Sequence, residues 1–150
     1  MLTTPQTIFV FAATWGWIGF SPLAPGTFGS LAALPFCFFI SSAGFAPGLV
    51  TIVAFIIIAS WICHKAETII GRKDPGQIVI DEVCGMMVAL WGLPFTPFFA
   101  VGGFALFRLF DIIKPFPIRW FDRKIKGGVG IVLDDVIAGI FTNILLRLFW

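Results

Sequence analysis

Five carboxylate side chains stand at the edges of apolar segments, where an ionised group needs a compensating charge. They are Asp81, Glu82, Asp111, Asp134 and Asp135. The first pair lies in DPGQIVIDEVCGMM, the single acid ends VGGFALFRLFD, and the second pair opens DDVIAGIFTNILL. Burying an ionised carboxylate near a bilayer costs about 2.5 to 3.5 kcal/mol on the insertion scales, so such residues are usually paired, hydrated or bound to a cation. The pattern therefore indicates a polar site to which all five contribute.

These acids together would repel one another too strongly to stay ionised beside a low-dielectric phase. A divalent cation supplies the missing charge, and ligands that are all oxygen suit Mg²⁺ or Mn²⁺ better than Zn²⁺. Mg²⁺ typically keeps several waters and shares its coordination with substrate phosphates. We therefore expect the five acids to be metal ligands and catalytic groups of a Mg²⁺ site, with Mn²⁺ as a substitute.

Basic residues accompany the acids in FRLFDIIKPFPIRWFD. Arg108, Asp111 and Lys114 repeat every three residues and so share a helical face until Pro115. Lys offers a point charge and Arg a bidentate clamp for a phosphate ester, and we expect Arg108, Lys114 and Arg119 to bind one. Anchoring to lipid headgroups is the alternative for these cations. It is the favoured interpretation for Arg123, Lys124 and Lys126.

Two further groups are candidates on weaker signals. The segment APGTFGS offers the hydroxyls of Thr27 and Ser30 before an apolar run, as a phosphate cradle at a helix N-terminus would, although it lacks the Gly-Lys-Ser/Thr ending of a Walker A loop. His64 stands three residues before Glu67 and could be a ligand or a base. A lone His at a membrane interface is more often a polar anchor.

The composition places this chain in a membrane. Hydrophobic residues make up 59% and charged residues 12% of its 150 residues, whereas about a quarter of the residues of a soluble protein are charged. The length allows one domain of four or five spans with short loops. A net charge of +2 does not indicate a nucleic-acid partner. Membrane lipids are the expected partners.

The apolar segments predict an all-α, multi-pass helical bundle. The first of them is too short to cross, at about 20 Å as a helix against a hydrocarbon core of about 30 Å, and should lie in the interface or re-enter. An uncharged turn is expected over 41–47. The segments are Ile8–Phe20, Phe28–Ile40, Gly48–Cys63, Ile78–Phe107 and Ile131–Phe149.

The stretch Ile78–Phe107 decides the topology. Uncharged after its DE pair, it would make a helix of about 45 Å, which is too long for one span. Gly92, Pro94 and Pro97 offer a break, so two short helices joined by a tight turn are predicted. All five acids then emerge on one membrane face. All but one of the ten Lys and Arg residues lie on that face too, and the positive-inside rule makes it cytoplasmic.

Four stretches carry a resemblance to a known family: PLAPGTFGSLAALP, DPGQIVIDEVCGM, FRLFDIIKPFPIRWFD and GGVGIVLDDVIAG. In this order, from about Ser21 to Gly139, they resemble phosphatidylglycerophosphatase A. The resemblance implies a Mg²⁺-dependent phosphatase of the inner membrane that converts phosphatidylglycerophosphate to phosphatidylglycerol. It also matches site residues to the family's DE pair, its FDxxKPxP segment and its DD pair. These are Asp81 and Glu82, Asp111 and Lys114, and Asp134 and Asp135.

Other classes fit the residues less well. A cation-coupled transporter would place acids deep in the spans and on both sides, whereas here they gather at one edge. A CDP-alcohol phosphatidyltransferase would carry D-x2-D-G-x2-A-R, which is missing. One His cannot furnish a phosphohistidine and its partner, and none of the three cysteines is followed by an Arg at the sixth position. Metal-assisted attack by water is the favoured chemistry.

Overall fold

The computed structural model describes residues 3–150, except for the side chains of Asp122 and Arg123. Within this range the elements are all helical, which confirms the all-α prediction. In chain order they are α1 (Thr4–Ala13), η1 (Ile18–Phe20), α2 (Pro25–Ala32), α3 (Leu34–Ala43), α4 (Phe45–Ile70), α5 (Ile80–Leu90), α6 (Pro97–Ile113), α7 (Ile118–Lys124), α8 (Gly127–Leu146) and η2 (Arg147–Phe149).

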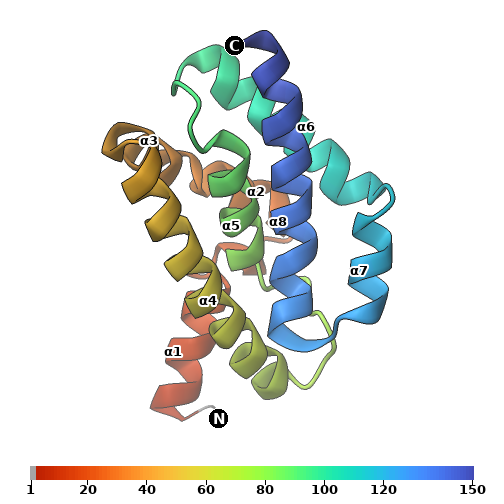
Figure 1. Ribbon diagram of the computed structural model, residues 1–150. Coiled ribbons are helices and arrows are strands. Elements are labelled where there is room, and N and C mark those ends of the chain that lie inside the picture. The colour runs from red at the N-terminus through yellow and green to blue at the C-terminus, as the bar shows by residue number, and fades with distance from the viewer. Residues whose placement is uncertain (1–2) are drawn as a thin grey trace.

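The short helix α5 lies at the centre of the bundle. Figure 1 shows it between α4 and α8, and it also packs against α2, α3 and α6. Because it is surrounded in this way, nearly all of its residues are buried, including the acid Asp81. The longer helix α8 runs beside it and contacts α4, α6 and α7 as well. The centre of the fold is therefore the α5–α8 pair, which carries four of the five predicted acids.

Two glycines let α5 and α8 approach closely. A Cβ on Gly85 of α5 would lie 2.8 Å from the carbonyl oxygen of Asp135 in α8. A Cβ on Gly139 would lie 3.1 Å from the Gly85 carbonyl carbon. Gly85 stands four residues after Asp81, on the same face of α5. The close crossing thus brings Asp135 next to Asp81.

Three helical segments are long and apolar enough to cross a membrane: 25–43, formed by α2 and α3 in succession, 45–70 and 127–149. They contain the predicted spans Phe28–Ile40, Gly48–Cys63 and Ile131–Phe149. The turn expected over 41–47 is wrong in extent, because α3 reaches Ala43 and α4 begins at Phe45. Gly44 alone makes the turn, at a φ of +91° that favours glycine. Helix α4 also continues past its predicted end to Ile70.

The predicted division of Ile78–Phe107 is confirmed. Helix α5 ends at Leu90 and α6 begins at Pro97. Thr96 caps α6 by accepting a hydrogen bond from the Phe99 N–H at 3.4 Å, and Pro97 occupies the first turn, where a missing N–H costs nothing. With 11 residues α5 is about 16 Å long, so the predicted count of four to five spans is only approximate.

The N-terminal apolar segment does not form one continuous helix. After α1 the chain reverses through Trp15, Gly16 and Trp17, all at positive φ, and then forms η1. Ala13, at the end of α1, accepts a hydrogen bond of 3.0 Å from the Val79 N–H, just before α5. The segment therefore positions the start of the central helix. Its location in the membrane interface stays a prediction.

Polar side chains at the far end of α8 cap the last carbonyls of α5. Asn143 Nδ2 donates to the carbonyl oxygens of Val88, Ala89 and Trp91 at 2.8 to 3.2 Å. Arg147 donates through Nε to Asn143 Oδ1 at 2.8 Å and through Nη2 to the Trp91 carbonyl at 3.2 Å. A helix leaves its final carbonyls without partners, and in an apolar interior this network supplies them. The network is structural, and periodicity alone did not predict it.

Candidate active site

Three of the predicted acids form one compact group in the interior. Oxygen atoms of Asp81, Glu82 and Asp135 all lie within 4.8 Å of one another. Asp81 is 9% and Asp135 3% exposed. Two buried oxygens of the group, Asp81 Oδ1 and Glu82 Oε2, have no hydrogen-bond partner among the described residues. A buried carboxylate oxygen without a partner is costly, so this carboxylate group has the chemistry of a cation site.

The other two predicted acids border this group, and each is paired with a cation. Asp111 Oδ2 accepts from Arg108 Nη1 at 2.6 Å, and the same nitrogen lies 3.9 Å from Glu82 Oε1. Asp134 Oδ2 accepts from Lys114 Nζ. Two ion pairs therefore lie beside the carboxylate group. Asp111 and Asp134 thus lie beside the carboxylate group, each next to a cation, and their part in the chemistry stays a prediction.

Helix α5 presents its two acids in its first turn. Its free N–H groups there carry a partial positive charge that favours the carboxylates of Asp81 and Glu82. The positions of Asp134 and Asp135 in α8 differ from the prediction, which placed these acids at the start of the helix. Asp134 lies seven residues after Gly127, or about 10 Å along the axis. The helix begins early because Gly128, lacking a side chain, packs against the backbone of Ser60 and His64 in α4.

The first turn of α2 closes one side of the site. A Cβ on Gly26 would collide with Glu82 Oε1 and would lie 3.0 Å from Arg108 Nη1. The segment APGTFGS thus lies beside the site, and it forms the first turn of a helix from Pro25 rather than a loop; its role as a phosphate cradle stays a prediction. The buried Ser30 hydroxyl donates to the Gly26 carbonyl at 2.8 Å, within its own helix.

Thr27 is partly exposed in the same turn, and its contact with substrate stays a prediction. The sequence reasoning missed Gly26, which has to lack a side chain for α2 to lie this close to Glu82 and Arg108. A glycine directly after the proline that begins a helix is the signal that could have indicated it.

Lys114 reaches the site by leaving its helix. The Arg108–Asp111 pair confirms the shared face expected from the three-residue spacing. Lys114, however, adopts a φ of +46° at the end of α6 and binds Asp134 on α8, rather than continuing the face towards Asp111. Its side chain is 26% exposed, the largest exposure among the four residues of the two ion pairs. Of these four side chains, Lys114 is therefore the most accessible from outside the protein.

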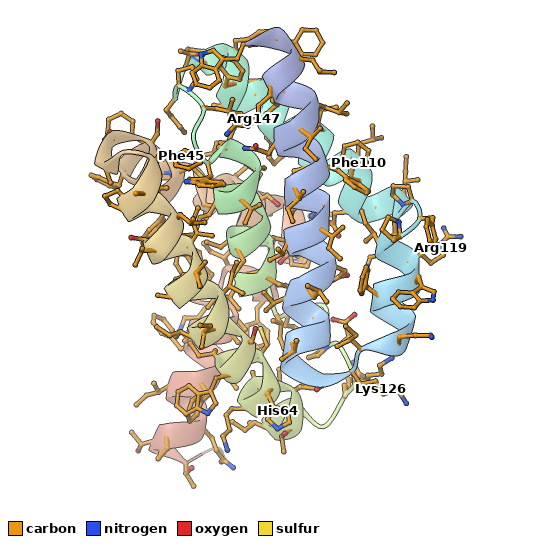
Figure 2. All side chains as sticks on the ribbon, in the orientation of Figure 1. Phe45, His64, Phe110, Arg119, Lys126 and Arg147 are labelled. Carbon is orange, nitrogen blue, oxygen red and sulfur yellow. The ribbon has the colours of Figure 1, made fainter. Side chains whose placement is uncertain are left out.

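Arg119 does not join the carboxylate group. Its Nη2 donates to the Ile113 carbonyl oxygen at 3.2 Å, and the side chain is exposed. Figure 2 shows it on the outer side of α7. The guanidinium at the carboxylates is that of Arg108. The reason is that α7 begins at Ile118 and carries Arg119 on its outward face, whereas the buried Ile118 faces the core.

His64 and Glu67 lie outside the carboxylate group. The exposed His64 is beside Gly127 and Gly128 at the start of α8, and Glu67 Oε1 accepts from the Asp74 N–H at 3.2 Å. Figure 2 shows His64 and Lys126 at the same end of the molecule, with Arg147 at the other. This favours the anchor interpretation of His64. Lys124 and Lys126 are exposed as headgroup anchors would be, and the side chain of Arg123 lies outside the described residues.

The comparisons with known proteins agree with the motifs. The sequence model of phosphatidylglycerophosphatase A matches residues 11–150. The chain belongs to this family. A phosphatidylglycerophosphatase A of Escherichia coli is 41% identical over 83% of this chain and 73% of its own length, and one of Haemophilus influenzae is 39% identical over 82% and 77%. The resemblance inferred from the four motifs is therefore confirmed.

A further relative carries a different name. A protein of Bacteroides thetaiotaomicron, named provisionally as a phosphatidylinositol-3-phosphatase, is 35% identical over 95% of this chain and 93% of its own length. No solved structure matches the chain. The names of all three relatives specify a phosphatase that acts on a phospholipid, and nothing in these findings supports the transporter alternative.

Proposed function

We propose that this protein hydrolyses the terminal phosphomonoester of phosphatidylglycerophosphate, giving phosphatidylglycerol and inorganic phosphate for phospholipid synthesis. The observation that carries the proposal is the buried group of Asp81, Glu82 and Asp135 with two cations beside it, in a chain of the phosphatidylglycerophosphatase A family. Water is the proposed nucleophile, because the chain lacks the DxDx[TV] signature of phosphatases that form an aspartyl phosphate, and its cysteines are buried and lack an Arg six residues later. The released groups are the lipid alcohol and the phosphate.

Asp81, Glu82 and Asp135 fit a divalent cation and would hold it. Their oxygens lie close together, and two of them are buried with no hydrogen-bond partner in the described part of the chain. Bound Mg²⁺ or Mn²⁺ would supply an activated water and positive charge for the phosphoryl oxygens. The charge balance also favours a cation, because among the described side chains five carboxylates face two cationic ones. Without further positive charge, a phosphate dianion would meet an excess of negative charge.

The side chains of the two ion pairs take the remaining roles. We assign the binding of the phosphoryl oxygens to Arg108 and Lys114, because an ion pair holds each of them beside the carboxylate group. Asp111 and Asp134 orient these two cations. A cation fixed in this way does not have to reorganise when the phosphate arrives or when charge develops on it.

A phosphate-release assay tests the function. We expect the purified protein with Mg²⁺ to release phosphate faster from phosphatidylglycerophosphate than from phosphatidylinositol 3-phosphate, phosphatidate or p-nitrophenyl phosphate. Faster release from phosphatidylinositol 3-phosphate would assign the substrate named for the Bacteroides relative instead. A purified, folded protein that releases phosphate from none of the lipids would refute a phosphatase function.

We also propose that the site opens to the cytoplasm, since nine of the ten Lys and Arg residues are predicted to lie on one membrane face, and Figure 2 shows Lys126 of that set at the opposite end of the molecule from Arg147. Single cysteines can test this because the native Cys37, Cys63 and Cys84 are buried. We expect Lys126→Cys to react with an impermeant maleimide only after cell lysis. Ser42→Cys, exposed at the α3–α4 turn, should react in cells whose outer membrane is permeabilised. The reverse pattern would place the site on the opposite face.

A further inference from the structure

A pocket of about 550 Å³ lies between the end of α6 and α7, outside the carboxylate group. The described residues that line it include three cations, Lys114, Arg119 and Lys124, and no carboxylate. Arg119 is held by the Ile113 carbonyl, and Lys124 Nζ lies 4.6 Å from the centre of the Trp120 ring. A pocket with this charge suits an anion.

Lys114 belongs to both places. Its Nζ binds Asp134 beside the carboxylate group, and its side chain also lines the pocket. Lys114 therefore lies at the boundary between the carboxylate group and this cationic pocket, and contributes to both. A ligand that filled both would carry two anionic groups separated by a short linker.

The outer side of the pocket is apolar and exposed. Ile113 is 53%, Phe116 82% and Trp120 44% exposed. In a membrane protein such a rim faces lipid or the interface, where Trp is commonly found. From the interior outwards, the protein thus presents three regions. The first is the carboxylate group, where a bound cation would meet a phosphoryl group, the second is the cationic pocket, and the third is an apolar surface.

A lipid with two phosphates has the same order of groups. In phosphatidylglycerophosphate the terminal phosphomonoester is joined through glycerol to a phosphodiester, and the diester is joined to the acyl chains. Phosphatidylinositol 3-phosphate, specified by the name of the Bacteroides relative, also has a diester between its monoester and its acyl chains. Both lipids therefore carry an inner diester, whereas phosphatidate carries none.

We infer that this pocket binds the inner phosphodiester of the substrate lipid through Arg119 and Lys124, and so selects lipids whose scissile phosphate lies one polyol beyond a diester. The inference rests on the proposed function and adds to it the feature of the headgroup that is recognised. Arg119 and Lys124 contact the substrate away from the reacting atoms. They should bind substrate and transition state equally, and so affect KM rather than kcat.

The test compares substrates with and without a diester. Arg119→Gln and Lys124→Gln would each be assayed in mixed micelles of an uncharged detergent, with and without an added anionic phospholipid that is not a substrate. The substrates are phosphatidylglycerophosphate, phosphatidylinositol 3-phosphate, phosphatidate and p-nitrophenyl phosphate. Lys65→Gln is the matched control, because it removes one exposed positive charge from α4, outside the pocket. For each variant KM and kcat would be measured separately.

We expect either pocket variant to raise KM for the two diester lipids about tenfold, the typical loss for one charge-assisted hydrogen bond, with kcat retained. KM for phosphatidate and p-nitrophenyl phosphate, and all values for Lys65→Gln, should stay within about twofold. An equal rise of KM on all four substrates would overturn the inference. An effect on KM that disappears when the added anionic lipid is omitted from the micelles would also overturn it, because it would indicate a site for bulk headgroups. Wild-type protein inactive on every lipid would instead refute the proposed function itself.

Discussion

Changing Asp135 to Asn is expected to lower kcat by about 10³-fold or more, and the same holds for Asp81→Asn and Glu82→Gln. Each substitution removes a carboxylate from a group whose oxygens lie within 4.8 Å of one another, and each keeps the size of the side chain. A metal site supplies several kcal/mol of transition-state stabilisation, and each 1.4 kcal/mol corresponds to a factor of ten in rate. Asp111→Asn and Asp134→Asn should also lose most activity, because they release Arg108 and Lys114. Steady-state phosphate release with and without Mg²⁺ measures the effect.

Two controls separate loss of chemistry from loss of folding. Glu67→Gln removes an acid that lies beside Gly127 at the start of α8, outside the carboxylate group, and should keep nearly full activity. Thermal unfolding in detergent, in the absence of metal, should show that Asp81→Asn and Asp135→Asn are no less stable than the wild type. Relief of repulsion between buried like charges favours the folded variant. Full activity in EDTA, or near-normal rates for all the carboxylate variants, would contradict the proposed metal site.

The break in the long apolar stretch could be predicted from the sequence, because the restrictions that proline imposes are local. Pro94 and Pro97 disfavour the interior of a helix whatever surrounds them, and the resulting turn brings Asp111 back to the side of Asp81. The three-residue spacing likewise predicted the contact between Arg108 and Asp111. Both inferences depend only on backbone geometry within one segment.

Which acids would form the compact group could not be predicted in the same way. Asp135 meets Asp81 because Gly85 and Gly139 allow α5 and α8 to cross closely, which is a property of two segments more than fifty residues apart. The sequence reasoning assigned both Lys114 and Arg119, on either side of Pro115, to phosphate binding. The left-handed conformation of Lys114 turns it towards α8, whereas the packing of α7 carries Arg119 outwards. Tertiary packing decided these positions.

Lys114→Met is expected to lower kcat by about 10²-fold, the typical cost of one preorganised donor at developing charge. Lys114 Nζ is held by Asp134 beside the carboxylate group, so it is already in place when negative charge grows on the phosphoryl oxygens and the leaving group. An interaction stronger in the transition state than in the bound substrate lowers kcat and kcat/KM together when it is removed. Lys114→Arg should recover only part of the rate, because a planar guanidinium cannot replace a point charge held in this geometry.

The contrast with Arg119 makes this prediction specific. Lys114 and Arg119 line the same pocket, but only Lys114 also reaches the carboxylate group, so kcat should fall for Lys114→Met and KM should rise for Arg119→Gln. Measuring kcat for Lys114→Met, Asp134→Asn and the double variant would give the coupling between Lys114 and Asp134. If they act as one unit, the double variant should be hardly slower than either single one. A Lys114→Met enzyme with normal kcat and raised KM would place Lys114 with Arg119 as a binding residue, and fully additive losses would separate Lys114 from Asp134.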